Sequence, residues 1–339
     1  MNDYAGVVRT AVLEANRLHR DLALQAKVIR GSGRIDIYDA ISRLDVPLFF
    51  TKLDGLLGAY YRHPSPGILV TTERPLNQQR FTAAHELGHH WLGHAPSIDD
   101  TESALRRMPF QQGQGDSIQE IGAETFAASF LLPRWLLDWH CERQDWTDDT
   151  FSDPIMIYQL ALRVGVSYAA TVWTLQRYGV FDRNFALAAA KLEVKELKKR
   201  LLRGYKPTNY RGDVWLVTER DNSLPVHGGP LDLLVVKLRE QSGGGYLWRV
   251  QTIEDRGLAI VADDRETAHD AAVGSPTLRV LTASARGRHQ GVLALAQARP
   301  WQPAEALNRL YIHYDFQGAH LQGWYKDQRD RYRDNLAAA

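Results

Sequence analysis

The sequence predicts an α+β protein whose regions differ in secondary structure. Up to residue 145, helical stretches alternate with extended runs rich in Phe, Tyr, Ile and Val. Residues 146–205 read as helical throughout, and residues 213–320 hold short apolar strands separated by turn residues, the spacing of an immunoglobulin-like all-β sandwich. A charged helix is expected at 321–339. We therefore expect four parts: 1–145, 146–205, 213–320 and 321–339.

Composition narrows the class of protein and its compartment. The chain has 339 residues, with 41 Lys and Arg against 40 Asp and Glu, so its overall charge gives no reason to expect nucleic acid or membrane partners. Cys141 is the one cysteine, which leaves no internal disulfide. The beginning of the chain has no apolar segment of signal-peptide length, and no run reaches about 18 apolar residues. We expect a cytoplasmic protein without a membrane span.

Hydrophobic periodicity and turn residues predict the elements of the first part in detail. In chain order we expect helices over 4–28 and 36–46, a hairpin over 47–72, a helix over 73–94, a polar loop at 95–117 and a helix from 118 that breaks at Pro133. Further along, 158–180 reads as two short helices around Gly165, the shape of a helix-turn-helix, and 186–204 as one basic helix.

Residues 85–89 carry the clearest chemical signal, an H-E-x-x-H sequence. His85 and His89 are four apart and therefore share one face of a helix, where two imidazoles can bind one metal ion. Glu86 lies between them and points at the remaining coordination space. A catalytic site of this kind needs a third protein ligand and an open position.

Glu120 and Glu124 are the candidates for the third ligand. They are also four apart, on a helix that is otherwise nearly all apolar. One can ligate the metal while the other accepts a hydrogen bond from a ligand histidine. The alternative is a solvated helix face, but buried carboxylates without partners are costly, and a metal accounts for them more simply.

Two neighbouring histidines do not fit the ligand geometry. The extended pattern that adds a third histidine requires Gly at 92 and His at 95, whereas the chain has Leu92 and Ala95. His94 misses that position by one residue, about 100° of helix, so we expect it to cap the helix end or line the cleft. His90 is expected to be an exposed polar residue.

The stretch "RFTAAHELGHHWLGH", followed by "EIGAETFAASFLLP", resembles the ImmA/IrrE family of zinc metallopeptidases over residues 5–140. The resemblance implies a zincin-like fold and a metalloendopeptidase with a gluzincin-like Glu ligand. It assigns His85, His89 and Glu120 to Zn²⁺, with Mn²⁺ as an alternative ion, and Glu86 as the base that takes a proton from water. Glu124 stands where the family has Asn. Oxyanion donors would come from Tyr60, Tyr61, His90 or His94, and the strand at 67–72 would pair with an extended substrate.

The same resemblance implies a protein substrate. Family members commonly cleave a repressor of the helix-turn-helix (XRE) class in stress response or mobile-element control. No such repressor is fused to this chain, so the substrate is expected to be a separate protein.

The β region resembles a second family. "QSGGGYLW", "VGSP" and "ARPW" are similar to the three loops of the chagasin family, immunoglobulin-like inhibitors of papain-type cysteine proteases. The positions that carry the resemblance are Gly245, Tyr246, Trp248, Gly274, Arg299, Pro300 and Trp301. Residues 241–244 replace the family's Asn-Pro-Thr-Thr. This domain therefore implies a protease or another protein partner, and Trp248 and Trp301 can alternatively be packed aromatics of an ordinary sandwich.

A third hypothesis is DNA binding through the helical region. A basic run follows the helix-turn-helix-like segment and comprises Lys191, Lys195, Lys198, Lys199, Arg200, Arg203, Lys206 and Arg211. Glu193 and Glu196 are interleaved with it, so the alternative is a solvated helix face with local ion pairs.

Overall fold

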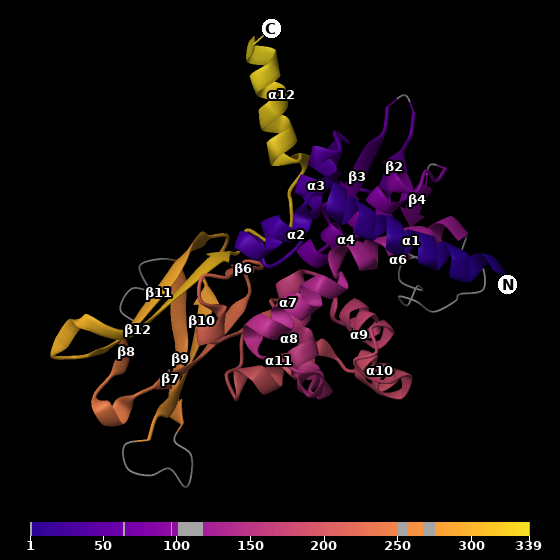
Figure 1. Ribbon diagram of the computed structural model, residues 1–339. Coiled ribbons are helices and arrows are strands. Elements are labelled where there is room, and N and C mark those ends of the chain that lie inside the picture. The colour runs from indigo at the N-terminus through magenta and orange to yellow at the C-terminus, as the bar shows by residue number, and fades with distance from the viewer. Residues whose placement is uncertain are drawn as a thin grey trace.

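The computed structural model describes residues 2–63, 65–95, 97–100, 118–249, 257–266 and 275–338. Figure 1 shows a first region of helices around a small sheet, a helical region beside it, and a β-sandwich. The last helix, α12 (Lys326–Ala338), projects from the first region (Figure 1). This arrangement agrees with the predicted α+β class.

The first region is built on a mixed sheet with the strand order β13-β1-β3-β2-β4. Its strands are β1 (Leu48–Thr51), β2 (Leu56–Tyr61), β3 (Gly67–Thr71), β4 (Ser97–Asp100) and β13 (Gly323–Trp324). The predicted hairpin is present, because β2 and β3 pair antiparallel, while β1 runs parallel to β3. β4 was not predicted and lies in the segment expected to be a loop.

This strand order corrects one expectation about substrate binding. Both edges of β3 are already hydrogen-bonded, to β1 and to β2, so the strand at 67–71 cannot accept a further strand. Among the strands that the structure describes, β4 and β13 form the margins of this sheet. β-Augmentation at β3 is therefore excluded.

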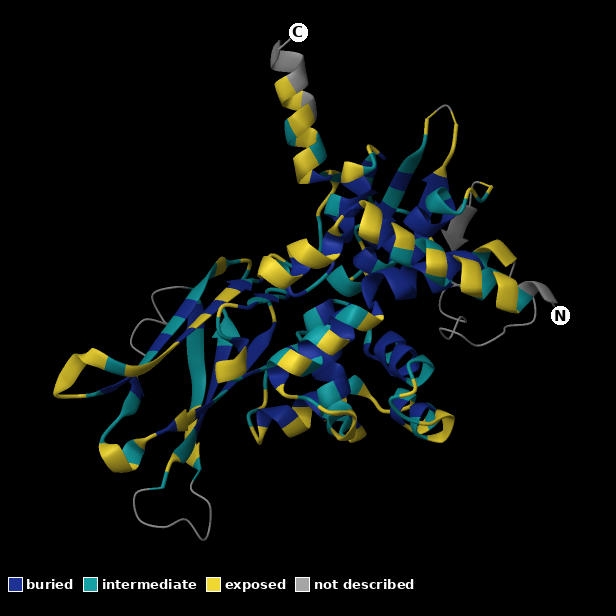
Figure 2. Ribbon diagram, in the orientation of Figure 1, coloured by how far each residue is buried: buried dark blue, intermediate teal, exposed yellow. Residues whose placement is uncertain are grey.

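The helices of the first region are α1 (Asn2–Asp21), α2 (Leu24–Lys27), the π-helical turn η1 (Val28–Ser32), α3 (Ile37–Arg43), α4 (Leu76–Trp91) and α6 (Ile118–Leu131). Asp36 caps α3, because its carboxylate accepts hydrogen bonds from the Tyr38 and Asp39 amides. α4 is buried from Thr82 to His89, and Figure 2 shows exposed residues along much of α12.

The helical region contains α7 (Arg134–Gln144), η2 (Asp148–Ser152), α8 (Pro154–Val164), α9 (Tyr168–Arg177), α10 (Arg183–Ala190) and α11 (Val194–Leu202). α8 and α9 meet at a bend of 103°, within the range of helix-turn-helix pairs. The single helix predicted over 186–204 is wrong: Glu193 adopts extended backbone and begins α11 separately. The break lets α10 bury Ala186 and Ala189 while α11 buries a different apolar face.

The β-sandwich consists of two four-stranded sheets with the orders β5-β7-β10-β9 and β6-β12-β11-β8. Its strands are β5 (Val214–Val217), β6 (Pro225–His227), β7 (Leu233–Glu240), β8 (Leu247–Arg249), β9 (Leu258–Glu266), β10 (Thr277–Ala285), β11 (Gln290–Arg299) and β12 (Gln302–Asp315). All the predicted strands are present, and only the short β6 was not expected. Leu234, Leu281, Leu295 and Ile312 belong to the core between the sheets.

β7 joins the sandwich to the helices because both of its faces are covered. Leu234 and Val236 point into the sandwich core, whereas Leu233 and Val235 belong to the large core that also contains the helices of the first two regions. A continuous apolar run such as this one is typical of a strand buried on both sides. The four-part division of the chain remains a proposal.

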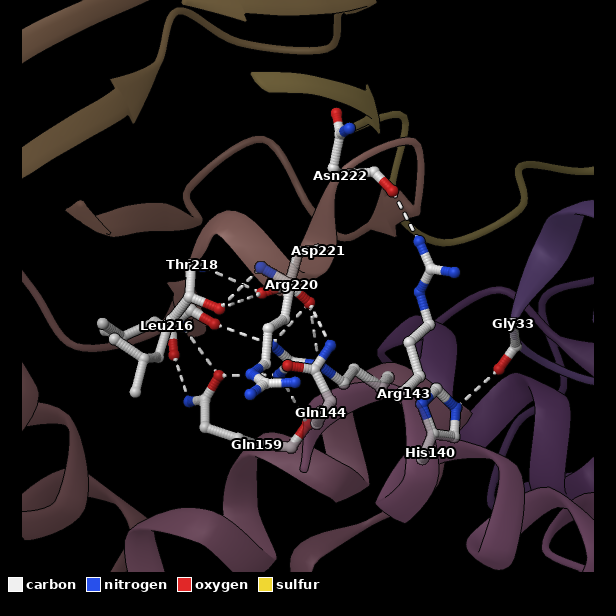
Figure 3. Close-up of polar contacts among 12 residues, drawn as sticks. Gly33, His140, Arg143, Gln144, Gln159, Leu216, Thr218, Arg220, Asp221 and Asn222 are labelled. Atoms are coloured by element: carbon white, nitrogen blue, oxygen red, sulfur yellow. Dashed lines mark hydrogen bonds and ion pairs between the residues drawn. The ribbon is translucent and has the colours of Figure 1, made fainter. Parts of the chain in front are cut away.

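A polar network fixes the same junction (Figure 3). The Asp221 carboxylate accepts hydrogen bonds from Gln144 Nε2 at 2.8 Å and from Arg163 Nη2 at 2.9 Å. Arg163 also donates to the Leu216 carbonyl, and Gln159 accepts from the Leu216 amide. α7 and α8 thus hold the first strand of the sandwich through charged and neutral hydrogen bonds.

After the sandwich, the chain returns to the first region in a segment that we call the C-terminal strap, residues 317–331. Its strand β13 pairs with β1, and the imidazole of His320 stacks on Phe50. Gln328 accepts from the Leu48 amide and donates to the Val46 carbonyl. The strap therefore closes the molecule by tying its last residues to the first sheet.

Within the ranges that the structure describes, no single helix is long and apolar enough to cross a membrane; α8 and α9 would reach that length and composition only as a bent pair.

Candidate metal centre and inhibitor-like loops

Helices α4 and α6 bring three side chains to one point. His85 Nε2 lies 3.1 Å from His89 Nε2 and 3.2 Å from Glu120 Oε2. His89 Nε2 lies 3.4 Å from Glu120 Oε1. Both imidazoles are buried, and Glu120 retains a little solvent contact. The two histidines come from successive turns of α4, and the carboxylate comes from the first turn of α6.

These separations fit a tetrahedral metal ion. Zinc bonds of about 2.0–2.2 Å at tetrahedral angles separate neighbouring ligand atoms by about 3.3–3.6 Å. The ligand atoms of the three residues all lie within 4.8 Å of one another, and the donor set of two imidazoles and one carboxylate is that of a catalytic zinc site. The three residues His85, His89 and Glu120 therefore fit the zinc ion that the sequence suggests.

Glu120, rather than Glu124, approaches the two imidazoles. Glu124 lies one turn further along α6, is half-buried, and is not among the three converging residues. Burial by itself would raise the pKa of Glu120, but hydrogen bonds with His85 and His89 and their charges outweigh it, so the pKa falls well below its usual range. Glu120 is therefore held as a carboxylate, the form that a metal requires.

Small residues allow α4 and α6 to approach closely enough. A Cβ on Gly88 would lie 3.1 Å from the backbone of Ala123, so a larger side chain at 88 would push α6 away. Ala123 is itself completely buried. Because Glu120 is one turn before Ala123, this contact sets how near its carboxylate comes to His85 and His89.

Glu86 points at β2, on the side of α4 that faces the sheet. Its side chain is completely buried, and Oε1 would lie 2.8 Å from a Cβ on Gly58. The methyl group of Thr82 would lie 2.5 Å from the same Cβ. Gly58 thus makes room for the carboxylate, a role that the sequence analysis missed.

His94 lies against His89, on the side away from Glu120. The helix does not continue to residue 94: Gly93 adopts a left-handed conformation with φ of 70°, and the His94 amide donates to the His89 carbonyl. With Gly93 donating to His90, this is a Schellman turn. It brings His94 Nδ1 to 3.1 Å from His89 Nδ1.

His94 is not among the three converging residues, in agreement with the expectation that it is not a ligand, although the turn at Gly93 and not a continuing helix places it. Burial, together with repulsion from His89, lowers the pKa of His94 to about 4, so its imidazole is neutral and can accept a hydrogen bond. When His89 Nδ1 donates in this contact, its Nε2 is left free for a metal.

Of the three remaining candidates for an oxyanion donor, Tyr60 and His90 lie side by side, whereas Tyr61 lies elsewhere. Tyr60 is buried, and its hydroxyl lies 3.3 Å from His90 Nδ1, so His90 is half-buried rather than exposed as expected. Tyr61 is 45% exposed and follows Tyr60 on β2, so it points to the opposite face of the sheet. The structure therefore does not bring Tyr61 to the metal centre.

At the far end of the sandwich, two of the inhibitor-like loops meet. The guanidinium of Arg299 lies over the ring of Tyr246, and its Nε donates to the Gly244 carbonyl. Gly245 has a φ of 77°, and a Cβ there would lie 2.6 Å from the indole of Trp301. Trp301 remains 68% exposed. We call this group of residues, 242–246 and 299–301, the sandwich tip.

Two further loop residues differ from the expectation. Trp248 is 2% exposed, lies in the sandwich core and donates to the Arg239 carbonyl, so it is the packed aromatic of the alternative and not a contact residue. Pro300 is exposed beside Trp301. Gly274 lies outside the described residues.

The basic run is largely committed to contacts within the chain. Lys198 pairs with Asp213 and Lys199 with Glu196, while Arg200 and Arg203 pair with Asp153 and Glu266. No residue of α9 is exposed, although a DNA-recognition helix must present side chains to a groove. The geometry gives no support to DNA reading by this helix.

Comparisons with known proteins match two parts of the chain to families. Residues 41–176 match the model of the IrrE N-terminal-like domain, Peptidase_M78, and residues 231–315 match the chagasin family peptidase inhibitor I42. The chain joins a peptidase-like region to an inhibitor-like region. Both predicted resemblances are thereby confirmed. We refer to them as the M78-like region and the chagasin-like region.

Three solved structures that are similar to the chain include a cysteine protease inhibitor. The inhibitor EhICP2 from Entamoeba histolytica is 21% identical and matches over 32% of this chain and 99% of its own, with a TM-score of 0.29. Amebosin is 19% identical over 30% and 96% of the two chains, with a TM-score of 0.26. PbICP-C, solved in complex with falcipain-2, is 14% identical over 33% and 96%, with a TM-score of 0.22. No curated protein matches the chain.

Proposed function

We propose that the protein is a zinc-dependent endopeptidase that cleaves a separate protein. The observation that carries this proposal is the convergence of His85, His89 and Glu120 with their ligand atoms within 4.8 Å, beside the buried Glu86. The match of residues 41–176 to a peptidase family supports it. The ligand set also accommodates Mn²⁺, so the ion is part of the proposal.

The residues of the chain divide the work of peptide hydrolysis. A bound ion supplies Lewis-acid polarisation of the scissile carbonyl and of water. The Glu86 carboxylate accepts the proton of the attacking water and passes it to the leaving amine. His94 orients His89, and the close contact of Gly88 with Ala123 keeps Glu120 in place.

We propose that the substrate is a repressor of the helix-turn-helix (XRE) class and that the peptidase cleaves it in a reducing cytoplasm. The resemblance to ImmA/IrrE peptidases supports this class of substrate. No residue of α9 is exposed, so this helix does not favour the alternative of DNA binding. Control of stress response or of a mobile element would follow from removal of the repressor.

The test compares the wild type with Glu86→Gln. Each protein is loaded with zinc and incubated with candidate repressors, and fragments are identified by mass spectrometry. We expect wild-type cleavage at a defined bond and a loss of at least about 100-fold in Glu86→Gln, because general-base catalysis contributes about 10²–10⁴-fold. Zinc content should stay at one ion per chain in both.

Cleavage by Glu86→Gln at the wild-type rate would refute the proposed role of Glu86 as the general base. Cleavage of an unrelated protein and of no repressor would remove the substrate class and keep the peptidase. Arg62→Gln, a change at an exposed position, is the matched control and should cleave normally.

A second candidate function is binding of a protease by the chagasin-like region. The exposed Trp301, held over Gly245 beside the stacked Arg299 and Tyr246, is the observation that favours it. An exposed aromatic on a rigid turn is a typical interface anchor. Papain titrated with the full chain should be inhibited, and Trp301→Ala should weaken inhibition about 10-fold or more, whereas Leu13→Ala on α1 should not. Absence of inhibition by the wild type would exclude papain-like partners.

A further inference from the structure

A cavity of about 340 Å³ lies between the M78-like region, the end of the sandwich and the C-terminal strap. Its lining includes Arg34 and Tyr38 from around α3, Arg80 from α4, His227 from β6, and Arg288 and His320 from segments around the sandwich. A second cavity, of about 230 Å³, shares Arg34, Arg80 and His227 with it. The carboxylates of Asp36 and Asp315 also line the cavity, and burial lowers the pKa of both histidines, so its charged lining consists of Arg34, Arg80 and Arg288 together with these two acids.

Arg34 is the exceptional member of this lining. Within the described residues, its guanidinium makes no hydrogen bond and no carboxylate lies within ion-pair distance. Asp36 and Asp315 are the acids that attract it, but Asp36 caps α3 and Asp315 accepts from the Gln317 amide. The Arg34 side chain, which lines the cavity, therefore has five N–H donors without an acceptor among the described residues.

Arg80 adds a second guanidinium. Its side chain is 1% exposed, Nε donates to the Gly165 carbonyl, and Nη2 donates to the Ile35 carbonyl. These partners are neutral, so its charge is not compensated by a described carboxylate within ion-pair distance. Burial, together with repulsion from Arg80, lowers the pKa of Arg34 to about 9. Asp36 and Asp315 oppose this shift, but neither forms an ion pair with Arg34 or Arg80, so an anion would find two guanidinium groups without a carboxylate partner.

Tyr38 gives an independent indication of a ligand. Its side chain is 5% exposed, and its hydroxyl has no hydrogen-bond partner among the described residues. A buried hydroxyl without a partner costs about 1–3 kcal/mol, and structures usually satisfy such groups with protein, water or ligand. The ring borders the same cavity, edge-on to His320 at 4.7 Å.

We propose that this cavity binds a small oxyanion, a phosphate or carboxylate group of a metabolite. The planar fork of Arg34 binds the oxygens, because guanidinium groups match both anions in a bidentate manner. The hydroxyl of Tyr38 donates to one of the same oxygens. A volume of about 340 Å³ accommodates a metabolite of modest size.

The site lies apart from the metal centre and does not depend on the proposed peptidase activity. Arg80 lies five residues before His85 on α4, whereas His227 belongs to the sandwich. A ligand here would contact both the M78-like and the chagasin-like regions and would hold them together.

The test measures anion binding by the full chain. Isothermal titration and thermal unfolding are followed with inorganic phosphate and with succinate, against sodium chloride at equal ionic strength. We expect one of the two oxyanions to bind and to raise the unfolding temperature. Arg34→Met, which keeps the length of the side chain, should weaken binding at least about 10-fold, because a charge-assisted pair is lost. Arg62→Met, at an exposed position, should bind like the wild type.

Tyr38→Phe keeps the proposal falsifiable if Arg34→Met does not fold. Removal of an unsatisfied hydroxyl should leave the unliganded protein as stable as the wild type or more so, yet weaken binding by about 3- to 10-fold. Preference for phosphate or for succinate identifies the chemistry of the ligand. The proposal is overturned if neither anion binds at millimolar concentration, or if the folded variants at 34 and 38 bind as tightly as the wild type.

Discussion

Three glycines and one histidine surround the helices that carry His85, His89 and Glu120. Gly88 lets the helices touch, Gly58 leaves room for Glu86, and Gly122 leaves room for the imidazole of His94, which would lie 3.2 Å from a Cβ at that position. His94 in turn holds His89. The geometry of the site thus depends on residues that do not contact a metal.

His94→Ala should weaken metal binding about 10- to 100-fold, the usual effect of losing a hydrogen bond to a ligand histidine. His94→Asn places an oxygen near the former Nδ1 and should recover most of the affinity. Competition with a zinc chelator measures this. Equal losses in both variants would indicate a packing defect, and no loss would exclude an orienting role. The exposed His63→Ala is the control.

Gly58→Ala should abolish cleavage and leave metal binding intact. The added methyl group would lie 2.5 Å from Thr82 and 2.8 Å from the Glu86 carboxylate, so Glu86 must move, whereas His85 and His89 are not among the nearest atoms that it would meet. Overpacking of this kind costs about 1–3 kcal/mol of stability. Peptidase assays and zinc content check the prediction. Gly67→Ala on β3 is the matched control, because its Cβ would meet nothing closer than 3.9 Å; normal cleavage by Gly58→Ala would refute the steric account.

At the scale of elements, the C-terminal strap supplies strand pairing along one edge of β1. β1 is flanked by β3 on one side, and β13 covers its other edge with a short antiparallel pairing. Exposed strand edges invite pairing with other chains, so a covered edge also protects against aggregation. Gln328 adds two side-chain hydrogen bonds at the start of β1, to the Leu48 amide and the Val46 carbonyl.

Gln328→Ala should lower the free energy of unfolding by about 1–3 kcal/mol, because it leaves the Leu48 amide and the Val46 carbonyl without partners. Urea unfolding measures the loss, and amide exchange should quicken at Leu48. Arg329→Ala, which removes only an exposed pair with Asp330, should change stability by no more than about 0.5 kcal/mol. If both variants behave alike, the strap does not stabilise β1.

At the scale of the whole molecule, the helices and the sandwich share one apolar core and one polar network. The outer face of β7 and the Asp221 network bind the sandwich to α7 and α8, while Asp232 holds the linker before β5. The Asp232 carboxylate accepts from the Asp213 amide and from Trp215 Nε1. The seam between the regions therefore contains a buried acid.

The buried Asp232 in this seam should make the free energy of unfolding depend on pH. Burial, with repulsion from Asp213, raises the pKa of Asp232 from 3.8 to about 7. The folded chain keeps this proton where the unfolded chain has lost it, so the stabilisation is complete below pH 3.8 and is lost as pH rises through about 7. Urea unfolding of wild type and Asp232→Asn across this range should show that the variant lacks this loss. Asp54→Asn, at a fully solvated carboxylate, should follow the wild type; parallel curves for Asp232→Asn would contradict the prediction.

The sequence by itself determined most of the elements and the placement of His85 and His89 on one face of α4, because helical and strand periods and the spacing of these histidines are local properties. It predicted the strand that includes residues 233–236, whereas the burial of both faces of that strand was found only in the structure. Only the tertiary structure decided the role of His94, since the turn at Gly93 replaces the helical angle on which the prediction relied. It likewise decided between Glu120 and Glu124, which depends on how closely Gly88 lets α6 approach. The cavity around Arg34 was also decided only by the tertiary structure. Its walls come from segments nearly three hundred residues apart, and no local sequence pattern shows which of these segments meet.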